Sequence, residues 1–219
     1  MAAKKTLAPR INEISLPELS PCRAEELEAE GYFEAKSLVG QDLSDLDLSG
    51  IQFVESALED INLDGTKLKA AAFKESTLSR INAAAFSAPR GRWADVRLEN
   101  SRLGSVEVYE TGFNSVIFSN CKLGYVNMRG ANLLDVIFEN CTIDELDLGN
   151  AKTHRVSLPG CRIGRLDITH ASFQDVDLRA ADIAELTSPE SLAGATLTEQ
   201  QVMFLAVSLA RNLGIRIEG

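Results

Sequence analysis

The sequence is poor in the residue types that most often build catalytic and metal sites. Only two of its 219 residues are histidine, and aromatic residues make up 6%. No apolar run approaches the roughly 18 residues that a membrane-spanning helix needs. The amino-terminal stretch MAAKKTLAPRINE also lacks the apolar segment of a signal peptide. These absences predict a cytoplasmic protein without a membrane span.

A double period dominates what is present. From Gln41 to Glu185, apolar residues occupy the first and third positions of almost every five, and polar residues or glycine fill most of the others. The same residue types also recur every twenty residues. A period of five fits neither an α-helix nor a flat strand, whose periods are about 3.6 and 2. It does fit a very short strand followed by a corner, and four such sides return the chain to its starting point.

Such coils would stack at the strand spacing of about 4.8 Å, which places residues twenty apart above one another. The 145 residues from 41 to 185 make about seven coils and roughly 34 Å of rod. Buried free thiols are preferred for the stacked cysteines, although neighbouring Cα atoms would be close enough for a disulfide. The expected core ladders are Cys121, Cys141 and Cys161; Val116, Val136, Val156 and Val176; and Phe53, Phe73, Trp93, Phe113 and Phe173.

Two segments resemble a known family. GANLL (residues 130–134) and HASFQDVDLRAADI (residues 170–183) are similar to the pentapeptide-repeat family, with its small residue, polar residue, Leu or Phe, and two variable residues. The resemblance implies an all-β solenoid, specifically a right-handed quadrilateral β-helix. The handedness rests on the resemblance alone. We expect short helical caps at both ends, because a bare solenoid end exposes unpaired backbone.

The repeat divides the chain into three parts. Ser20 and Pro21 have the residue types of an N-cap and a first helical position, so a short helix is expected after them. Lys36 would fall on an inward position, and the repeat is therefore not extended before residue 41. The expected parts are residues 1–40, an N-terminal extension and helical cap; residues 41–187, the β-helix; and residues 188–219, shifted repeats, a helix and a dimerisation segment.

Residues 81–95 (INAAAFSAPRGRWAD) blur the repeat without changing its phase. Pro89 cannot donate to a β-ladder, but Trp93 still falls in phase with the aromatic ladder. Two interpretations remain open. The segment is either a bulged or kinked coil with no net slip, or an outward loop that carries Arg90 and Arg92 to a partner.

A helix is predicted over residues 199–212. Thr198 and Gln201 have the spacing of a capping box at its start, and Gly214 can end it. Beyond the glycine, Ile215 and Ile217 are expected to form a last strand. Between residues 202 and 210 only one residue is polar, which is more apolar than a helix buried on a single side needs.

This excess of apolar residues predicts a homodimer, with a simple end cap as the alternative. The tail resembles that of the mycobacterial fluoroquinolone-resistance members of the pentapeptide-repeat family, which pair through their C-terminal helices. An isologous two-fold contact is also the commonest oligomer geometry. The expected dimer interface consists of Val202, Met203, Leu205, Ala206 and Leu209.

No catalytic chemistry is predicted, and no cofactor or metal site is expected. His154 and His170 fall on outward positions of different sides of the coil. A filled solenoid also has no cavity for a small substrate. One outward column is rich in acidic residues, which we attribute to a solvated surface: Glu55, Glu75, Asp95, Asp135 and Asp175.

The charge of the chain argues for a protein partner. The formal net charge is −10, and the segment from 41 to 185 has 22 acidic and 15 basic residues, or 15 − 22 = −7. Direct nucleic-acid binding is disfavoured, because phosphates require a basic surface. The family resemblance implies a rod that mimics duplex DNA and binds DNA gyrase or topoisomerase IV, giving resistance to quinolones or toxins. The alternative is an interaction scaffold with an unrelated partner. The candidate contact residues are Asp144, Glu145, Asp182 and Glu185.

Overall fold

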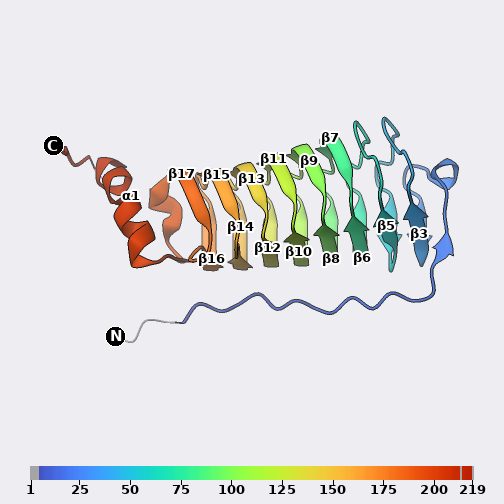
Figure 1. Ribbon diagram of the computed structural model, residues 1–219, viewed down its shortest axis with the longest axis horizontal. Helices are drawn as coiled ribbons and strands as arrows, with labels where there is room; N and C mark the ends of the chain where they lie inside the picture. The colour runs from blue at the N-terminus through green and yellow to red at the C-terminus, as the bar shows by residue number, and fades with distance from the viewer. Residues whose placement is uncertain (1–4, 213, 219) are drawn as a thin grey trace.

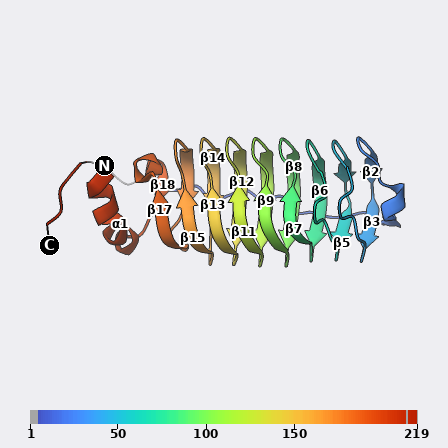
Figure 2. The ribbon, with the colours of Figure 1, turned by 90° about the horizontal axis from the view of Figure 1, so that it is seen from above.

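The computed structural model describes residues 5–212 and 214–218 and has the form of a parallel β-solenoid (Figure 1). Within this range the strands belong to a 12-stranded sheet and a 6-stranded sheet, here called the large sheet and the small sheet. The coils follow one another along a single axis, and helix α1 (Glu199–Asn212) lies at the C-terminal end of the stack (Figure 2). The predicted all-β quadrilateral solenoid is therefore confirmed.

The large sheet runs the whole length of the rod. Its main path passes through ten strand levels, so nine spacings of about 4.8 Å give roughly 43 Å. This is longer than the seven coils predicted, because the stack continues at both ends. Its strands are β1 (Ser20–Pro21), β2 (Tyr32–Glu34), β3 (Lys36–Val39), β4 (Gln52–Val54), β5 (Ala57–Glu59), β6 (Ala72–Ser79), β8 (Arg92–Glu99), β10 (Gly112–Ser119), β12 (Asn132–Glu139), β14 (Lys152–Ser157), β16 (Ser172–Asp177) and β18 (Ala195–Thr196).

The small sheet covers another side of the rod. Its partners keep the twenty-residue register, as in the pairing of Leu146 with Leu166 between neighbouring coils. Every ladder of this sheet is parallel, which is what successive turns of one solenoid require. Its strands are β7 (Asn82–Ser87), β9 (Arg102–Glu107), β11 (Lys122–Asn127), β13 (Thr142–Asp147), β15 (Arg162–Asp167) and β17 (Asp182–Thr187).

Corners of the coil adopt the left-handed backbone conformation. Asn100, Asn120 and Asn140, one above the other, have φ values of 53°, 52° and 52°. Asparagine, aspartate and glycine tolerate this region best, which explains why they occupy many of these corners, although residues such as Arg80 and Glu110 adopt it as well. The corner residues turn the chain by about a right angle, and the short strands between them point two side chains inward.

The inward side chains fill the rod completely. Phe53 and Phe73 stack with ring centroids 5.8 Å apart, and Trp93 lies 5.0 Å from Phe73. The predicted cysteine, valine and aromatic ladder residues are all buried, with Phe173 the most exposed of them at 8%. The four cysteines are free and buried. Identical layers at one spacing therefore build a continuous core from very few residue types.

The N-terminal cap differs from the prediction. Ser20 and Pro21 form strand β1, which pairs with β3, and only the short 3₁₀ helix η1 (Ala24–Glu26) follows. The predicted short helix is therefore present, but it begins at Ala24, and Ser20 and Pro21 are not its N-cap and first helical residue. The pairing between β2 and β4 already has the twenty-residue register, so regular coils begin before residue 41. Lys36 is accommodated because its side chain is only half-buried and its ammonium group donates to the Ser20 hydroxyl at 3.0 Å.

Residues 81–95 form neither a bulge nor a protruding loop. β7 and β8 pair with the neighbouring coils in unbroken register, including Trp93 with Phe73 and with Phe113. Arg90 forms an ion pair with Glu110 of the next coil, at 2.6 Å. Alanine is tolerated at inward positions here because the large Trp93 and Phe86 side chains fill the same layer.

The C-terminal end agrees with the prediction except for its last strand. The slipped phase is real, because β18 pairs Ala195 with Val176, nineteen residues earlier, after the 3₁₀ helix η2 (Pro189–Leu192). The Thr198 hydroxyl accepts from the Gln201 amide at 3.2 Å, and the Gln201 side chain accepts from the Thr198 amide at 2.8 Å. Residues 215–218 form no strand, and Ile215 remains 54% exposed.

Gly194 is the residue that allows the slipped coil to close. Its φ is +92°, and a Cβ atom at this position would overlap the carbonyl oxygen of Phe173. We expect Gly194→Ala to lower the free energy of unfolding by about 2–4 kcal/mol, because backbone cannot move aside as a flexible side chain does. Gly40→Ala is the control, because Gly40 has a φ of +63° with nothing near its Cβ position. It should cost only the left-handed penalty of about 1–2 kcal/mol. Urea unfolding followed by circular dichroism would measure both, and equal costs would contradict the steric explanation.

Candidate protein-interaction surfaces

An extended N-terminal segment lies along the outside of the rod. Residues 5–19, here called the strap, run from the C-terminal coils back to β1 (Figure 1). The strap has no helix or strand, and none of its residues is buried. It starts beside β18, where the Thr6 hydroxyl forms a hydrogen bond with the Thr196 hydroxyl. The strap therefore follows the solenoid without being part of any coil.

The strap is held by members of one column of corner side chains, here called the strap column: Glu55, Glu75, Asp95, Ser115, Asp135, Arg155 and Asp175. Among the described residues, the members that bond to the strap are Asp95, Ser115, Asp135 and Asp175. The backbone N–H of Leu7 donates to Asp175 Oδ1 at 3.2 Å, and that of Arg10 donates to Asp135 Oδ1 at 2.8 Å. The backbone N–H of Asn12 donates to the Ser115 hydroxyl at 3.0 Å. The Asn12 side chain also donates to Asp95 Oδ1 at 2.8 Å.

The interpretation of these acids as a solvated surface is wrong for Asp95, Asp135 and Asp175, which bind the strap; Glu55 and Glu75 form no hydrogen bond to it among the described residues. Asp135 is 5% exposed and Ser115 is 4% exposed, because the strap covers them. The acidic column was visible in the sequence, and so was a proline-containing N-terminal stretch without helical pattern. The sequence could not indicate that the N-terminal stretch lies on the acidic column. The twenty-residue period places only residues of the coils and gives no position to a segment outside them.

Asp135 is the best-defined group of the strap column. Arg155 donates to both of its oxygens, from Nε and Nη2 at 2.6 Å each. Burial opposes ionisation of Asp135, but the hydrogen bonds from Arg155 and from the Arg10 backbone, with their positive charges, hold its pKa below the usual value. The carboxylate is thus charged at neutral pH and is oriented by Arg155 toward the strap. Asp175 differs, since its buried Oδ2 has no hydrogen-bond partner among the described residues.

The four acids predicted to contact a partner lie on the small sheet. Asp144 and Glu145 belong to β13, and Asp182 and Glu185 belong to β17. Strand β15 separates the two pairs. Its Arg162 pairs with Asp182, and its Arg165 stands in register between Glu145 and Glu185. The Arg162–Asp182 contact is long, at 3.9 Å, and both side chains are highly exposed. The small sheet therefore presents alternating charges rather than a purely acidic face.

The predicted dimer residues occupy different sides of α1. Val202 and Met203 are 45% and 71% exposed, and Ala206 is also exposed. Leu205 and Leu209 are only half-buried, and Leu205 faces the last coil. Two further apolar residues outside the predicted set are exposed, Phe204 at 66% and Val207 at 45%. The exposed apolar surface of α1 is thus formed by Val202, Met203, Phe204, Ala206 and Val207.

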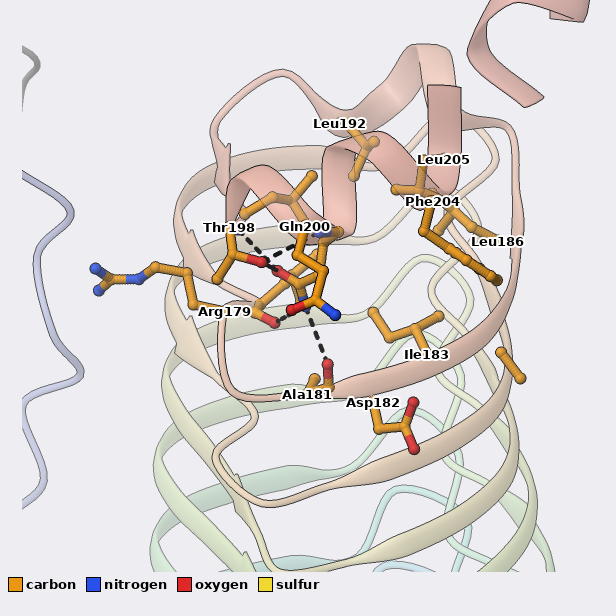
Figure 3. A pocket seen from close by; sticks show the side chains of 14 residues that line it. Arg179, Ala181, Asp182, Ile183, Leu186, Leu192, Thr198, Gln200, Phe204 and Leu205 are labelled. Carbon is orange, nitrogen blue, oxygen red and sulfur yellow. Dashed lines mark hydrogen bonds between the residues drawn. The ribbon is translucent and has the colours of Figure 1, made fainter. Parts of the chain in front are cut away.

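A hollow separates α1 from the last coil (Figure 3). It has a volume of about 630 Å³ and is lined on the rod side by Ile183 and Leu186 and on the helix side by Phe204 and Leu205. Gln201 anchors the start of the helix, donating to the carbonyl oxygens of Leu178 at 2.8 Å and Ala181 at 3.0 Å. The helix is therefore attached at its first turn and stands away from the coil beyond it.

Other candidate groups do not form a site. His154 and His170 lie on different columns, and the described residues contain no group of three or more His, Cys, Asp or Glu side chains that could hold a metal ion. The hydrogen bond to Cys141 and burial both raise the pKa values of Cys121 and Cys161, which keeps these thiols protonated. None of the helices in the described ranges has the length and hydrophobicity for a membrane span.

Comparison with known proteins agrees with this architecture. Residues 91–188 match a family described as a pentapeptide repeat region. The matched residues lie within the β-solenoid. Among solved structures, full-length QnrB1, a plasmid-mediated fluoroquinolone resistance protein, is similar at 19% identity over 86% of this chain and 94% of QnrB1, with a TM-score of 0.38.

A second similar structure is HetL from the cyanobacterium Nostoc sp. strain PCC 7120, a pentapeptide-repeat protein involved in heterocyst differentiation regulation. HetL is 18% identical over 77% of this chain and 90% of its own length, with a TM-score of 0.34. No curated protein matches the chain. At this level of similarity, neither structure's function transfers to the solenoid described above.

Proposed function

We propose that this pentapeptide-repeat rod is a non-enzymatic protein that binds a type II topoisomerase, such as DNA gyrase, by mimicking a segment of duplex DNA. The observation that carries the proposal is the excess of acidic over basic side chains on a long rod whose coils are filled with side chains. The rod segment from 41 to 185 has a net charge of −7. An enzyme that binds DNA in a basic groove would attract such a surface electrostatically.

The dimensions of the rod are compatible with this role. Its length of roughly 43 Å corresponds to about 13 base pairs at about 3.4 Å per pair. On the small sheet, the exposed acids of β13 and β17 stand two coils apart, or about 9.6 Å. The interleaved Arg162 and Arg165 are exposed as well, and both can pair with acidic groups of the partner.

We further propose that two copies pair through α1. The supporting observation is the exposed apolar surface of Val202, Met203, Phe204, Ala206 and Val207 at the end of the rod. A second copy would cover this surface and close the hollow under the helix. A two-fold contact at the end would roughly double the acidic rod to about 25 base pairs of duplex. A protein that binds DNA gyrase is expected in the cytoplasm.

The direct test is inhibition of gyrase supercoiling by the purified protein, with and without a fluoroquinolone. We expect inhibition that weakens about tenfold for the double variant Asp144→Lys and Asp182→Lys, because both charges become repulsive in a basic groove. The inhibition should also weaken with added salt.

The matched control is the double variant Glu55→Lys and Asp60→Lys, which changes the charge equally on the large-sheet side. It should inhibit nearly as well as the unchanged protein. Equal inhibition by both double variants would reject the small sheet as the contact face. No effect of the protein on gyrase would favour a scaffold with an unrelated partner.

A further inference from the structure

The strap is bound in the way that a protein binds an extended peptide ligand. Three of its hydrogen bonds to the strap column use backbone N–H groups of Leu7, Arg10 and Asn12, which any peptide except one with proline at these positions could supply. One more comes from the Asn12 side chain to Asp95. The atoms that accept from the three backbone N–H groups belong to side chains of three different coils. Two of these side chains, Asp135 and Ser115, are at least 95% buried beneath the strap. The strap column is therefore a preformed peptide-binding site that the strap already fills.

The spacing of the site matches an extended chain. From Asp175 to Asp135 is two coils, or about 9.6 Å, and from Leu7 to Arg10 is three residues, or about 10 Å when extended. One further coil leads to Ser115, and two further residues lead to Asn12. The rise of an extended peptide thus brings backbone N–H groups to the coils of Asp175, Asp135 and Ser115, and it passes over the intervening coil of Arg155.

The occupant is separable from the rod. No residue of the strap belongs to the hydrophobic core, whose first member is Cys22. The coil backbone bonds are made without it, beginning with Ser20 N to Ala35 O at 2.9 Å. Removing the strap would expose the charges of Asp95, Asp135 and Asp175 without opening the core. Elements that add few buried contacts open at low free-energy cost.

The charges of the strap column select the kind of ligand. The part of the strap over the C-terminal coils carries Lys5 and Arg10 and no acid before Glu13. The Asp175 side chain is only 8% exposed, and its Oδ2 has no hydrogen-bond partner among the described residues; the imidazole of His154 lies 3.9 Å away, beyond hydrogen-bond distance. A donor from an arriving peptide would supply the hydrogen bond that neither the strap nor His154 makes to this oxygen. An extended cationic segment therefore fits the site at least as well as the strap.

We propose that the strap column is a binding groove for an extended cationic peptide of another protein, and that residues 5–12 are its resident ligand in cis. A second copy of this chain cannot supply the segment in a dimer paired through α1. Each strap is tethered at β1, the end opposite α1, and its fifteen residues span its own rod only once. The groove lies on the large sheet, so it does not depend on the contact proposed for the small sheet.

The test uses the full chain, folded with its strap and then cut. A site-specific protease sequence replaces residues 15–18, none of which is buried and none of which forms a hydrogen bond or ion pair with the strap column in the described structure. After cleavage and dilution, a fluorescent peptide of residues 4–14 is added and its anisotropy is measured. We expect saturable binding to the cut protein and at least about tenfold weaker binding to the uncut protein, whose groove is occupied.

Peptide variants keep the protein unchanged, so a folding failure cannot explain their effects. N-methylation at Leu7 and Arg10 removes the two donors to Asp175 and Asp135 and should weaken binding about tenfold or more. A peptide with Arg10→Glu should also bind more weakly. A peptide with alanine at Thr6, Leu7 and Ile11 should bind about as well as the original, because recognition is by backbone and charge.

Protein variants give a second readout. Asp135→Asn in the cut protein should weaken binding about tenfold, whereas Asp60→Asn, a left-handed corner on another column, should leave it unchanged. The proposal is overturned if the cut protein binds no peptide, or if N-methylation has no effect. Binding restricted to the chain's own sequence would also overturn it, because the strap would then be an integral latch and not the occupant of a general groove.

Discussion

Replacing Trp93 with alanine is expected to lower the free energy of unfolding by roughly 3–5 kcal/mol, the usual range for losing a large buried aromatic side chain. Trp93 is 1% exposed and occupies the centre of an aromatic cluster. Its ring lies 5.0 Å from that of Phe73 and 5.7 Å from that of Phe113. The cavity would fall in the middle of the rod, where two coils depend on the same layer for their packing.

The control is Trp93→Phe. The indole Nε1 of Trp93 is buried without a hydrogen-bond partner among the described residues, so phenylalanine removes an unsatisfied donor while it keeps most of the ring contacts. We expect a cost of about 1 kcal/mol or less. Urea unfolding followed by far-ultraviolet circular dichroism suits both variants, because the chain has no other tryptophan to report fluorescence. A phenylalanine variant as unstable as the alanine variant would contradict this account.

The second large effect concerns the oligomeric state. Replacing Met203 and Val207 with glutamate should convert a dimer into a monomer, since the change places two charges in the centre of the proposed contact. Both side chains are exposed, at 71% and 45%, and lie one helical turn apart on α1. The rod itself should keep its stability, because neither side chain belongs to the core. Sedimentation velocity at several protein concentrations would measure the change.

The choice of positions separates an interface from an end cap. Leu205 and Leu209 are half-buried, so charges there would also loosen α1 from the last coil. Loss of the dimer could then result either from a broken interface or from a displaced end cap. Lys69→Glu is a suitable control, because it makes the same change of two charge units at an exposed position far from α1. A monomeric unchanged protein, or a dimer that survives both glutamates, would reject pairing through this helix.

The repeat was predictable because its period is a local property repeated many times. Each pentad carries its own inward residues and its own left-handed corner, so errors at one coil, such as the alanines and Pro89 of residues 81–95, do not alter the phase of the next. The burial of Cys121, Cys141 and Cys161 follows from the same regularity. The N-terminal cap of α1 was equally predictable, since its two hydrogen bonds join Thr198 and Gln201, which are only three residues apart in the sequence.

The N-terminal features outside the repeat were decided by the tertiary structure. The start of the short N-terminal helix was misplaced because an edge strand of the first coil was available to pair with Ser20 and Pro21, and propensity yields to such pairing.

The sequence by itself determined the solenoid, its core ladders, its acidic balance and its C-terminal helix. The tertiary structure alone decided that the strap lies on Asp95, Ser115, Asp135 and Asp175, since these contacts join residues more than eighty positions apart. It also decided that Arg162 and Arg165 divide the acids of the small sheet. The physical reason is the same in both cases: a local period specifies what each coil buries, whereas the charges and segments that meet on its surface depend on the stacking of all the coils.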